Sequence, residues 1–165
     1  MTSMTSETLA DAVRSAMRCT ASGVAILATD GREGRAGVTV STLCSLSLEP
    51  PSVIACVHKD SRTLRTVLAN GVFSANILAE GQETVASAFA GAFTDHQDRF
   101  GTGSWADLDG LPRLEGAVAS FACRLADSHS FGTHVILIGE IFDVAATSNP
   151  PLIYADRAFH SLTAA

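Results

Sequence analysis

The chain has 165 residues, of which 47% are hydrophobic and 17% charged, and its formal net charge at pH 7 is −6. This length suits a single domain, residues 1–165, with a core of its own. The acidic balance and the lack of any Lys/Arg cluster argue against a nucleic acid or an anionic membrane surface as the main partner.

No apolar run approaches the roughly 20 residues that a membrane-spanning helix needs. The N-terminus also lacks a charged region followed by an apolar core. We therefore expect a cytoplasmic protein with no membrane partner. The high apolar content predicts that some surface is buried in an oligomer, for which a homodimer is the simplest assembly.

The first third of the chain predicts a helix followed by a β-hairpin. Residues 1–5 are expected to be disordered, and Ser6 can cap a helix over residues 7–19. The apolar face of that helix, which we expect to pack against the core, comprises Leu9, Val13, Ala16 and Met17. Residues 23–29 are an apolar run, and the Gly-rich, charged residues 30–35 predict a hairpin loop.

Residues 37–51 form the most informative stretch. From Val38 to Leu48 apolar residues alternate with small polar ones, which predicts one strand with two different faces. The polar face carries Thr39, Ser41, Cys44, Ser45 and Ser47, with no charge before Glu49. Short hydroxyls suit a flat, neutral heterocycle, because they form hydrogen bonds without filling the space of the ring. The alternative is a Ser/Thr-rich strand of an ordinary β-barrel.

A buried strand over residues 52–58 is predicted to lead into a second helix. Asp60 or Ser61 can cap this helix, and Asn70 followed by Gly71 is a stop signal. The free amides at its start, together with Lys59, Ser61, Arg62 and Thr63, predict an anion site that could hold a phosphate. The alternative is a capped surface helix that happens to begin with basic residues.

The remaining chain predicts more strands than helices. We expect a strand over residues 72–78, a helix over 80–90, a long loop over 91–103, a turn-rich stretch from Trp105 to Pro112, and strands over 117–126, 131–145 and 150–154. There is no regular βαβ alternation, no internal repeat and no Gly-x-Gly-x-x-Gly motif. The pattern predicts a mainly β fold, a β-barrel with helices outside it.

Motifs for hydrolase, NTPase, zinc or calcium chemistry are absent from the sequence. The four cysteines are scattered without metal-binding spacing and are expected to be small buried thiols. His134 is the strongest catalytic candidate, because it stands at the head of the most apolar strand, just after Gly132 and Thr133. The alternative is a histidine whose ring is satisfied by hydrogen bonds in the core.

Several segments, in order, resemble the flavin reductase-like family, the small reductase components of two-component flavin-dependent monooxygenases. Residues 37–51 resemble its Gly-x-Thr-x-Ser-Ser, Ser-x-Ser and Pro-Pro pattern. Residues 131–140 are similar to its Gly-Asp-His strand, with Thr133 where the family usually has Asp. Further matches are Asp98-Arg99-Phe100 with Trp105, Leu111-Pro112-Arg113-Leu114, and Pro151-Leu152-Ile153-Tyr154.

The resemblance implies a split β-barrel of the flavin reductase or FMN-binding type. It also implies hydride transfer from NADH to the N5 atom of free flavin, FAD with FMN possible, and release of reduced flavin to a partner monooxygenase. His134 would contact the nicotinamide. The residues implied for flavin are Thr39, Val40, Ser41, Thr42 and Ser45 at the ring, His58, Lys59, Ser61, Arg62 and Thr63 near the phosphate, and Phe93, Arg99 and Tyr154 around the pocket.

Three other functions remain open on sequence grounds. The first is a flavin-binding module without turnover. The second is an oxidase of the pyridoxamine-phosphate-oxidase type, which shares the barrel and would hold FMN tightly. The third is a barrel without a ligand. The sequence alone does not separate FAD from FMN, although the aromatic and polar loop around residues 93–100 favours FAD slightly, and it does not separate NADH from NADPH.

Overall fold

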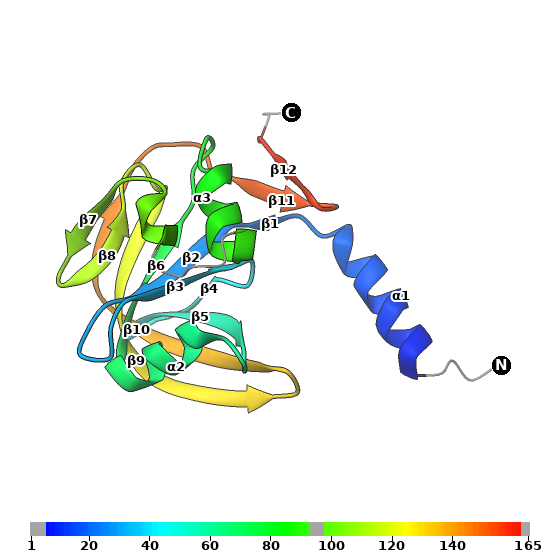
Figure 1. The fold of residues 1–165 in the computed structure, drawn as a ribbon, viewed down its shortest axis with the longest axis horizontal. Helices are drawn as coiled ribbons and strands as arrows, with labels where there is room; N and C mark the ends of the chain where they lie inside the picture. The colour runs from blue at the N-terminus through cyan, green and yellow to red at the C-terminus, as the bar shows by residue number, and fades with distance from the viewer. Residues whose placement is uncertain (1–5, 93–97, 163–165) are drawn as a thin grey trace.

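The computed structural model describes residues 6–92 and 98–162. Residues 1–5, which were predicted to be disordered, lie outside this range. The fold is mainly β, as predicted (Figure 1). The helices are α1 (Ser6–Arg18), α2 (Arg62–Asn70), α3 (Glu83–Ser87), η1 (Ala88–Ala92) and η2 (Asp98–Gly101). The strands are β1 (Ser22–Gly23), β2 (Ala25–Thr29), β3 (Ala36–Val40), β4 (Cys44–Leu48), β5 (Pro51–His58), β6 (Val72–Ile77), β7 (Trp105–Leu108), β8 (Leu111–Leu114), β9 (Ala119–Phe131), β10 (His134–Ala146), β11 (Ile153–Ala155) and β12 (Ala158–His160).

One sheet of seven strands dominates the molecule, in the order β3-β2-β6-β9-β10-β5-β4, with every neighbouring pair antiparallel. Its two edge strands, β3 and β4, are joined by residues 41–43 alone. Four Cα–Cα steps span at most roughly 14 Å, so the sheet must curl until its edges approach one another. The edges do not pair. The fold is therefore the predicted split barrel.

The predicted single strand over residues 38–48 is thus wrong. Its polar and apolar residues keep alternating through residues 41–43, but the backbone leaves one edge of the sheet there and enters the other. Alternation with a period of two shows which side chains face apolar or polar surroundings. It does not show which strand the segment pairs with, so it can continue where the partner strand changes. The turn-rich stretch that begins at Trp105 is also more regular than expected, because it forms the β7–β8 hairpin.

Two apolar cores lie on the two faces of β2. Ala25 and Leu27 face the core inside the barrel, where α2 contributes Leu64 and Val67. Val24, Ile26 and Ala28 face the second core, together with Phe89, Leu114 and Leu152. Burial on both faces explains why residues 24–28 are a continuous apolar run instead of an alternating one.

A buried polar network joins the β7–β8 hairpin to the sheet. Asn76, which is fully buried, accepts hydrogen bonds from the Ser120 hydroxyl at 2.8 Å and the Leu114 amide at 3.0 Å. Its side-chain amide donates to Ser74 Oγ at 3.1 Å and to the Pro112 carbonyl at 3.3 Å. All of its polar capacity is used within the core, as a buried amide requires.

Helix α1 forms as predicted, but its apolar face does not pack against the barrel. Leu9, Val13 and Met17 are 54%, 52% and 61% exposed, and α1 projects from the body of the molecule (Figure 1). The amphipathic pattern therefore predicted the helix correctly, but it did not predict which surface covers the apolar face. Among the described helices, none is both long enough and apolar enough to cross a membrane.

Candidate functional site

The junction between β3 and β4 is held against strand β5 by one threonine. Thr42 Oγ1 accepts a hydrogen bond from the Cys56 amide at 3.0 Å and donates to the Cys56 carbonyl at 3.3 Å. The side chain therefore takes the place of a strand partner where the ladder is interrupted. This contact attaches the junction, residues 41–43, to Cys56, two residues before His58 at the end of β5. We call this junction the crossover.

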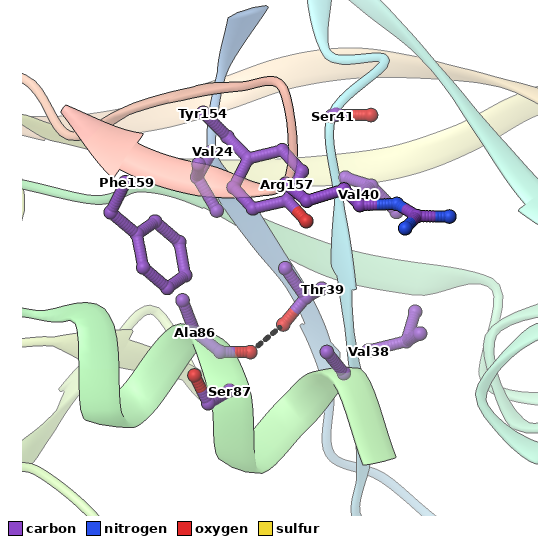
Figure 2. A pocket seen from close by; sticks show the side chains of 11 residues that line it. Val24, Val38, Thr39, Val40, Ser41, Ala86, Ser87, Tyr154, Arg157 and Phe159 are labelled. Carbon is purple, nitrogen blue, oxygen red and sulfur yellow. Dashed lines mark hydrogen bonds between the residues drawn. The ribbon is translucent and has the colours of Figure 1, made fainter. Parts of the chain in front are cut away.

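A cavity of about 610 Å³ opens beside the crossover, lined by β3, helix α3 with η1, and the β11–β12 hairpin (Figure 2). Thr39, Val40 and Ser41 form one wall, and Tyr154 and Phe159 face them. The Thr39 hydroxyl donates to the Ala86 carbonyl at 2.7 Å, which joins β3 to α3 and fixes the rotamer. The volume lies in the range of small-molecule sites, roughly 300–1,000 Å³.

The lining combines apolar faces with a few polar groups. Val24, Val38 and Phe159 supply flat apolar surface, whereas Ser41, Ser87 and Arg157 supply hydroxyl and guanidinium groups. An aromatic heterocycle with a polar edge fits such a lining, because its faces need apolar contact and its edge needs hydrogen bonds. The residues present therefore suit a flavin or a nicotinamide ring.

His134 and His58 form a pair on the other side of the crossover. They lie opposite each other in the β5–β10 ladder, and their rings meet edge to face with centroids 5.2 Å apart. Both are exposed. His134 Nδ1 lies 2.9 Å from Thr133 Oγ1, so Thr133 occupies the position of a hydrogen-bond partner to the ring.

The predicted anion site lies directly after His58. Ser61 is the N-cap of α2 and its side chain makes no capping hydrogen bond, which leaves the hydroxyl available to a ligand. Lys59 and Arg62 are exposed, and Asp60 donates its amide to His58 Nδ1 at 3.3 Å. Thr63 does not fit the prediction. It is 1% exposed, because it shares the inward face of α2 with Leu64 and Val67.

The structure thus sorts the predicted residues into two neighbouring groups. Thr39, Val40, Ser41 and Tyr154 line the cavity, whereas His58, Lys59, Ser61, Arg62 and His134 lie at the end of β5 and the start of β10 and α2. Thr42 connects the groups through Cys56. Ser45 is exposed on β4, and Phe93 lies outside the described residues.

Arg99 was expected to close over the cavity, and this expectation does not match the structure. The side chain is 9% exposed, it is not among the residues that line the cavity, and burial lowers the pKa of its guanidinium. Arg157 and Phe159, which do line it, were not predicted. They reach the cavity because the tight turn between β11 and β12 folds back toward β3, a tertiary contact without a local sequence signal.

The cysteines also differ from the expectation of four buried thiols. Cys19 and Cys44 are exposed, Cys56 is half-buried and Cys123 is buried. Burial raises the pKa of the Cys123 thiol to about 12. None of the four lines the cavity in the described part of the chain, and no group of His, Cys, Asp and Glu there has the arrangement of a metal site.

A curled, unclosed antiparallel sheet with outer helices and a ring-sized cavity beside its seam defines a split-barrel protein with a small-molecule site. The chain matches the model of the "Flavin reductase like domain" over residues 17–163. It therefore belongs to the flavin reductase-like family of oxidoreductases.

Comparisons with individual proteins support this family assignment. The chain is 40% identical over 155 residues to FMN reductase (NADH) RutF 1 of Methylorubrum extorquens, covering 93% of this chain and 77% of the relative. It superimposes on the NADH:FAD oxidoreductase SgcE6 of Streptomyces globisporus with a TM-score of 0.87, 26% identity and 99% of each chain covered. It matches the styrene monooxygenase flavin reductase of Pseudomonas putida S12 with a TM-score of 0.82, 25% identity, and 92% and 97% of the chains covered.

Proposed function

We propose that this protein is an NADH-dependent reductase of diffusible flavin that supplies reduced flavin to a separate monooxygenase. The observation that carries the proposal is that the crossover, residues 41–43, adjoins both places: Ser41 lines the cavity, and Thr42 is hydrogen-bonded to Cys56, two residues before the His58–His134 pair. Two flat rings that exchange a hydride must lie face to face. A site that holds one ring against β3 and a second toward His134 provides the two adjacent positions that this requires.

The flavin supplies the redox chemistry of the reaction, since its ring accepts a hydride equivalent and releases it later. The protein's own residues bind and orient. The backbone amides of Thr39 to Thr42 and the Ser41 hydroxyl would hold the edge of the flavin ring, Ser45 would contact a polar atom of the ring, and Tyr154 would close over the cavity. We assign the flavin phosphate to Lys59, Ser61 and Arg62, and the nicotinamide to His134.

Both FMN and FAD are proposed as substrates, with FMN preferred. The relative with 40% identity is named as an FMN reductase, whereas the neighbour named for FAD shares 26% identity. The aromatic loop around residues 93–100, which favoured FAD, contributes only Phe100 to the described core, and Phe100 packs there on Phe89 with ring centroids 4.9 Å apart. Phe100 is thus part of the apolar core, so at this residue the sequence argument for an adenine pocket, and with it for FAD, no longer applies.

The homodimer is proposed from two exposed apolar surfaces. One is the α1 face of Leu9, Val13 and Met17, and the other is the edge strand β4, where Leu46 and Leu48 are 49% and 81% exposed. Helix α1 projects from the body of the molecule (Figure 1). A second copy of the chain would therefore bury the apolar surfaces of α1 and β4 that this chain leaves exposed. Val13→Glu is expected to yield a monomer by light scattering. Leu68→Glu, at an exposed leucine on α2, is the control and should leave the dimer intact.

Steady-state oxidation of NADH, followed at the absorbance of the reduced nicotinamide with FMN, FAD or neither added, tests the activity. The expected result is oxidation that depends on added flavin, with kcat/KM higher for FMN. A protein that purifies with FMN that does not exchange, and that consumes an organic substrate, would instead be an oxidase of the pyridoxamine-phosphate-oxidase type. Flavin binding without oxidation would mark a binding module.

A further inference from the structure

A second cavity of about 250 Å³ adjoins the first, and the two share Ser41, Tyr154 and Arg157. It lies between the C-terminal half of α1 and the turn that joins β11 to β12. Its lining is unusual for this acidic chain, because it contains three of the eleven Lys and Arg residues, namely Arg14, Arg18 and Arg157.

The charges of this cavity are only partly balanced within the chain. Arg14 forms an ion pair with Asp11 on the same helix, and Asp156 lies in the lining beside Arg157. Among the described residues no carboxylate ion pair involves Arg18 or Arg157. The lining of this small cavity therefore includes two arginines without a carboxylate ion pair within the part of the chain that the structure describes and one aspartate, Asp156, which favours an anionic ligand with several acceptor oxygens.

The backbone holds Arg157 in an uncommon conformation at this place. Asp156 and Arg157 have φ values of 44° and 65°, in the left-handed region that residues other than glycine rarely adopt. The Asp156 amide donates to the Arg18 carbonyl at 2.8 Å, which ties the hairpin turn to the end of α1. In Figure 2 the Arg157 side chain extends toward β3, with its guanidinium end beside Val40.

We infer that the second cavity binds the diphosphate of the nicotinamide dinucleotide, next to the flavin ring that the proposed function places in the first cavity. The inference rests on the proposed function, which brings two phosphate-bearing nucleotides to the site. Lys59, Ser61 and Arg62 offer a cationic site for one of them on the far side of the crossover. Arg18 and Arg157 offer a second, separate cationic site on the near side. Because the flavin phosphate is assigned to Lys59, Ser61 and Arg62, the dinucleotide is the expected source, and the flavin phosphate is the other source that the test distinguishes.

The test is direct binding, measured without turnover. Kd values for NAD+, FMN, riboflavin and inorganic pyrophosphate are compared between wild type, Arg18→Gln, Arg157→Gln and the control Arg32→Gln. Arg32 lies in the exposed loop between β2 and β3, so the control removes one charge away from the cavity. Gln keeps an unbranched side chain, so the backbone of residue 157 meets a similar conformational demand.

Each of the two cavity variants is expected to weaken binding of NAD+ about tenfold, the typical effect of losing one charge-assisted hydrogen bond. Riboflavin, which lacks a phosphate, should change less than twofold. Loss confined to NAD+ supports the inference, whereas loss confined to FMN would place the flavin phosphate in this cavity and overturn its assignment to Lys59, Ser61 and Arg62. Pyrophosphate should compete with the affected nucleotide in wild type.

Two further results would overturn the inference. One is equal weakening of FMN and riboflavin with no change for NAD+, which would assign Arg157 to the ring. The other is no difference between the cavity variants and Arg32→Gln. Because these are binding measurements, they remain decisive even if NADH oxidation fails, so failure of the proposed function and failure of this inference give different results.

Discussion

Replacing Gly37 by alanine should destabilise the protein by forcing apart the aromatic cluster behind the cavity. A Cβ atom at position 37 would stand 2.5 Å from Phe89 Cε1 and 2.8 Å from Cδ1. Phe89 has no free space to move into, since it is fully buried and its ring contacts Phe100 and Trp105 at centroid distances of 4.9 and 5.4 Å. The clash must therefore displace the ring or the strand.

The size of the effect follows from the distance. The ring would have to retreat by about 0.9 Å to reach 3.4 Å, where ordinary van der Waals contact begins. Overpacking of this kind costs about 1–3 kcal/mol, and the rigid aromatic neighbours place Gly37→Ala near 3 kcal/mol. For a chain of this length that corresponds to a fall in Tm of roughly 6–12 °C.

Thermal unfolding followed by circular dichroism measures this shift. Gly23→Ala is the matched control, because a Cβ there meets nothing within 4 Å, and its Tm should change by less than about 2 °C. The double variant Gly37→Ala with Phe89→Leu should recover part of the loss, since the smaller side chain relieves the contact. Equal Tm values for Gly37→Ala and Gly23→Ala would refute the reasoning.

Three further predictions concern the core network, the histidine and the buried thiol. Asn76→Leu leaves the Leu114 amide and the Ser120 hydroxyl without their acceptor, so urea unfolding should show a loss of about 3 kcal/mol; a loss below 1 kcal/mol would contradict the network. His134→Ala should raise the KM for NADH about tenfold with flavin binding largely kept. The control is His129→Ala, at an exposed histidine on β9, which should change neither the KM nor flavin binding. Loss of flavin binding in His134→Ala would contradict the role proposed for His134. Burial raises the pKa of Cys123 from 9.0 to about 12, so the thiol loses its proton at lower pH in the unfolded chain than in the folded one. Between pH 9 and 12 the free energy of unfolding should therefore fall more steeply in wild type than in Cys123→Ala, by about 1.4 kcal/mol per pH unit. Parallel slopes for the two proteins would contradict the shift.

Much of the fold could be predicted from the sequence, because most of its elements carry local signals. The hairpin loop over residues 30–35, the end of α2 at Gly71 and the apolar strands all depend on turn residues and periodicity. The inward face of α2 was also readable, since Thr63, Leu64 and Val67 share one side of a helix. Applied to Thr63, that spacing would have removed it from the phosphate site.

Other features depend on contacts between distant segments and have no local signal. The break at residues 41–43 lies inside an unbroken alternating pattern, and only the curling of the sheet makes a change of edge possible. Arg18 and Arg157 line one cavity because a turn late in the chain is hydrogen-bonded to the end of the first helix. The exposure of α1 is likewise a tertiary property, because an amphipathic pattern shows that a face needs a partner and not which partner.

The central claim is that the protein turns over diffusible flavin with NADH. The most direct measurement is anaerobic mixing of the protein with NADH and a hundredfold excess of FMN, followed at the absorbance of the oxidised flavin, with FAD and NADPH in parallel reactions. The account predicts that one protein molecule reduces many flavin molecules and that NADH disappears in equal amount. Reduction of at most one flavin per protein, or none with either flavin and either nicotinamide, would contradict it.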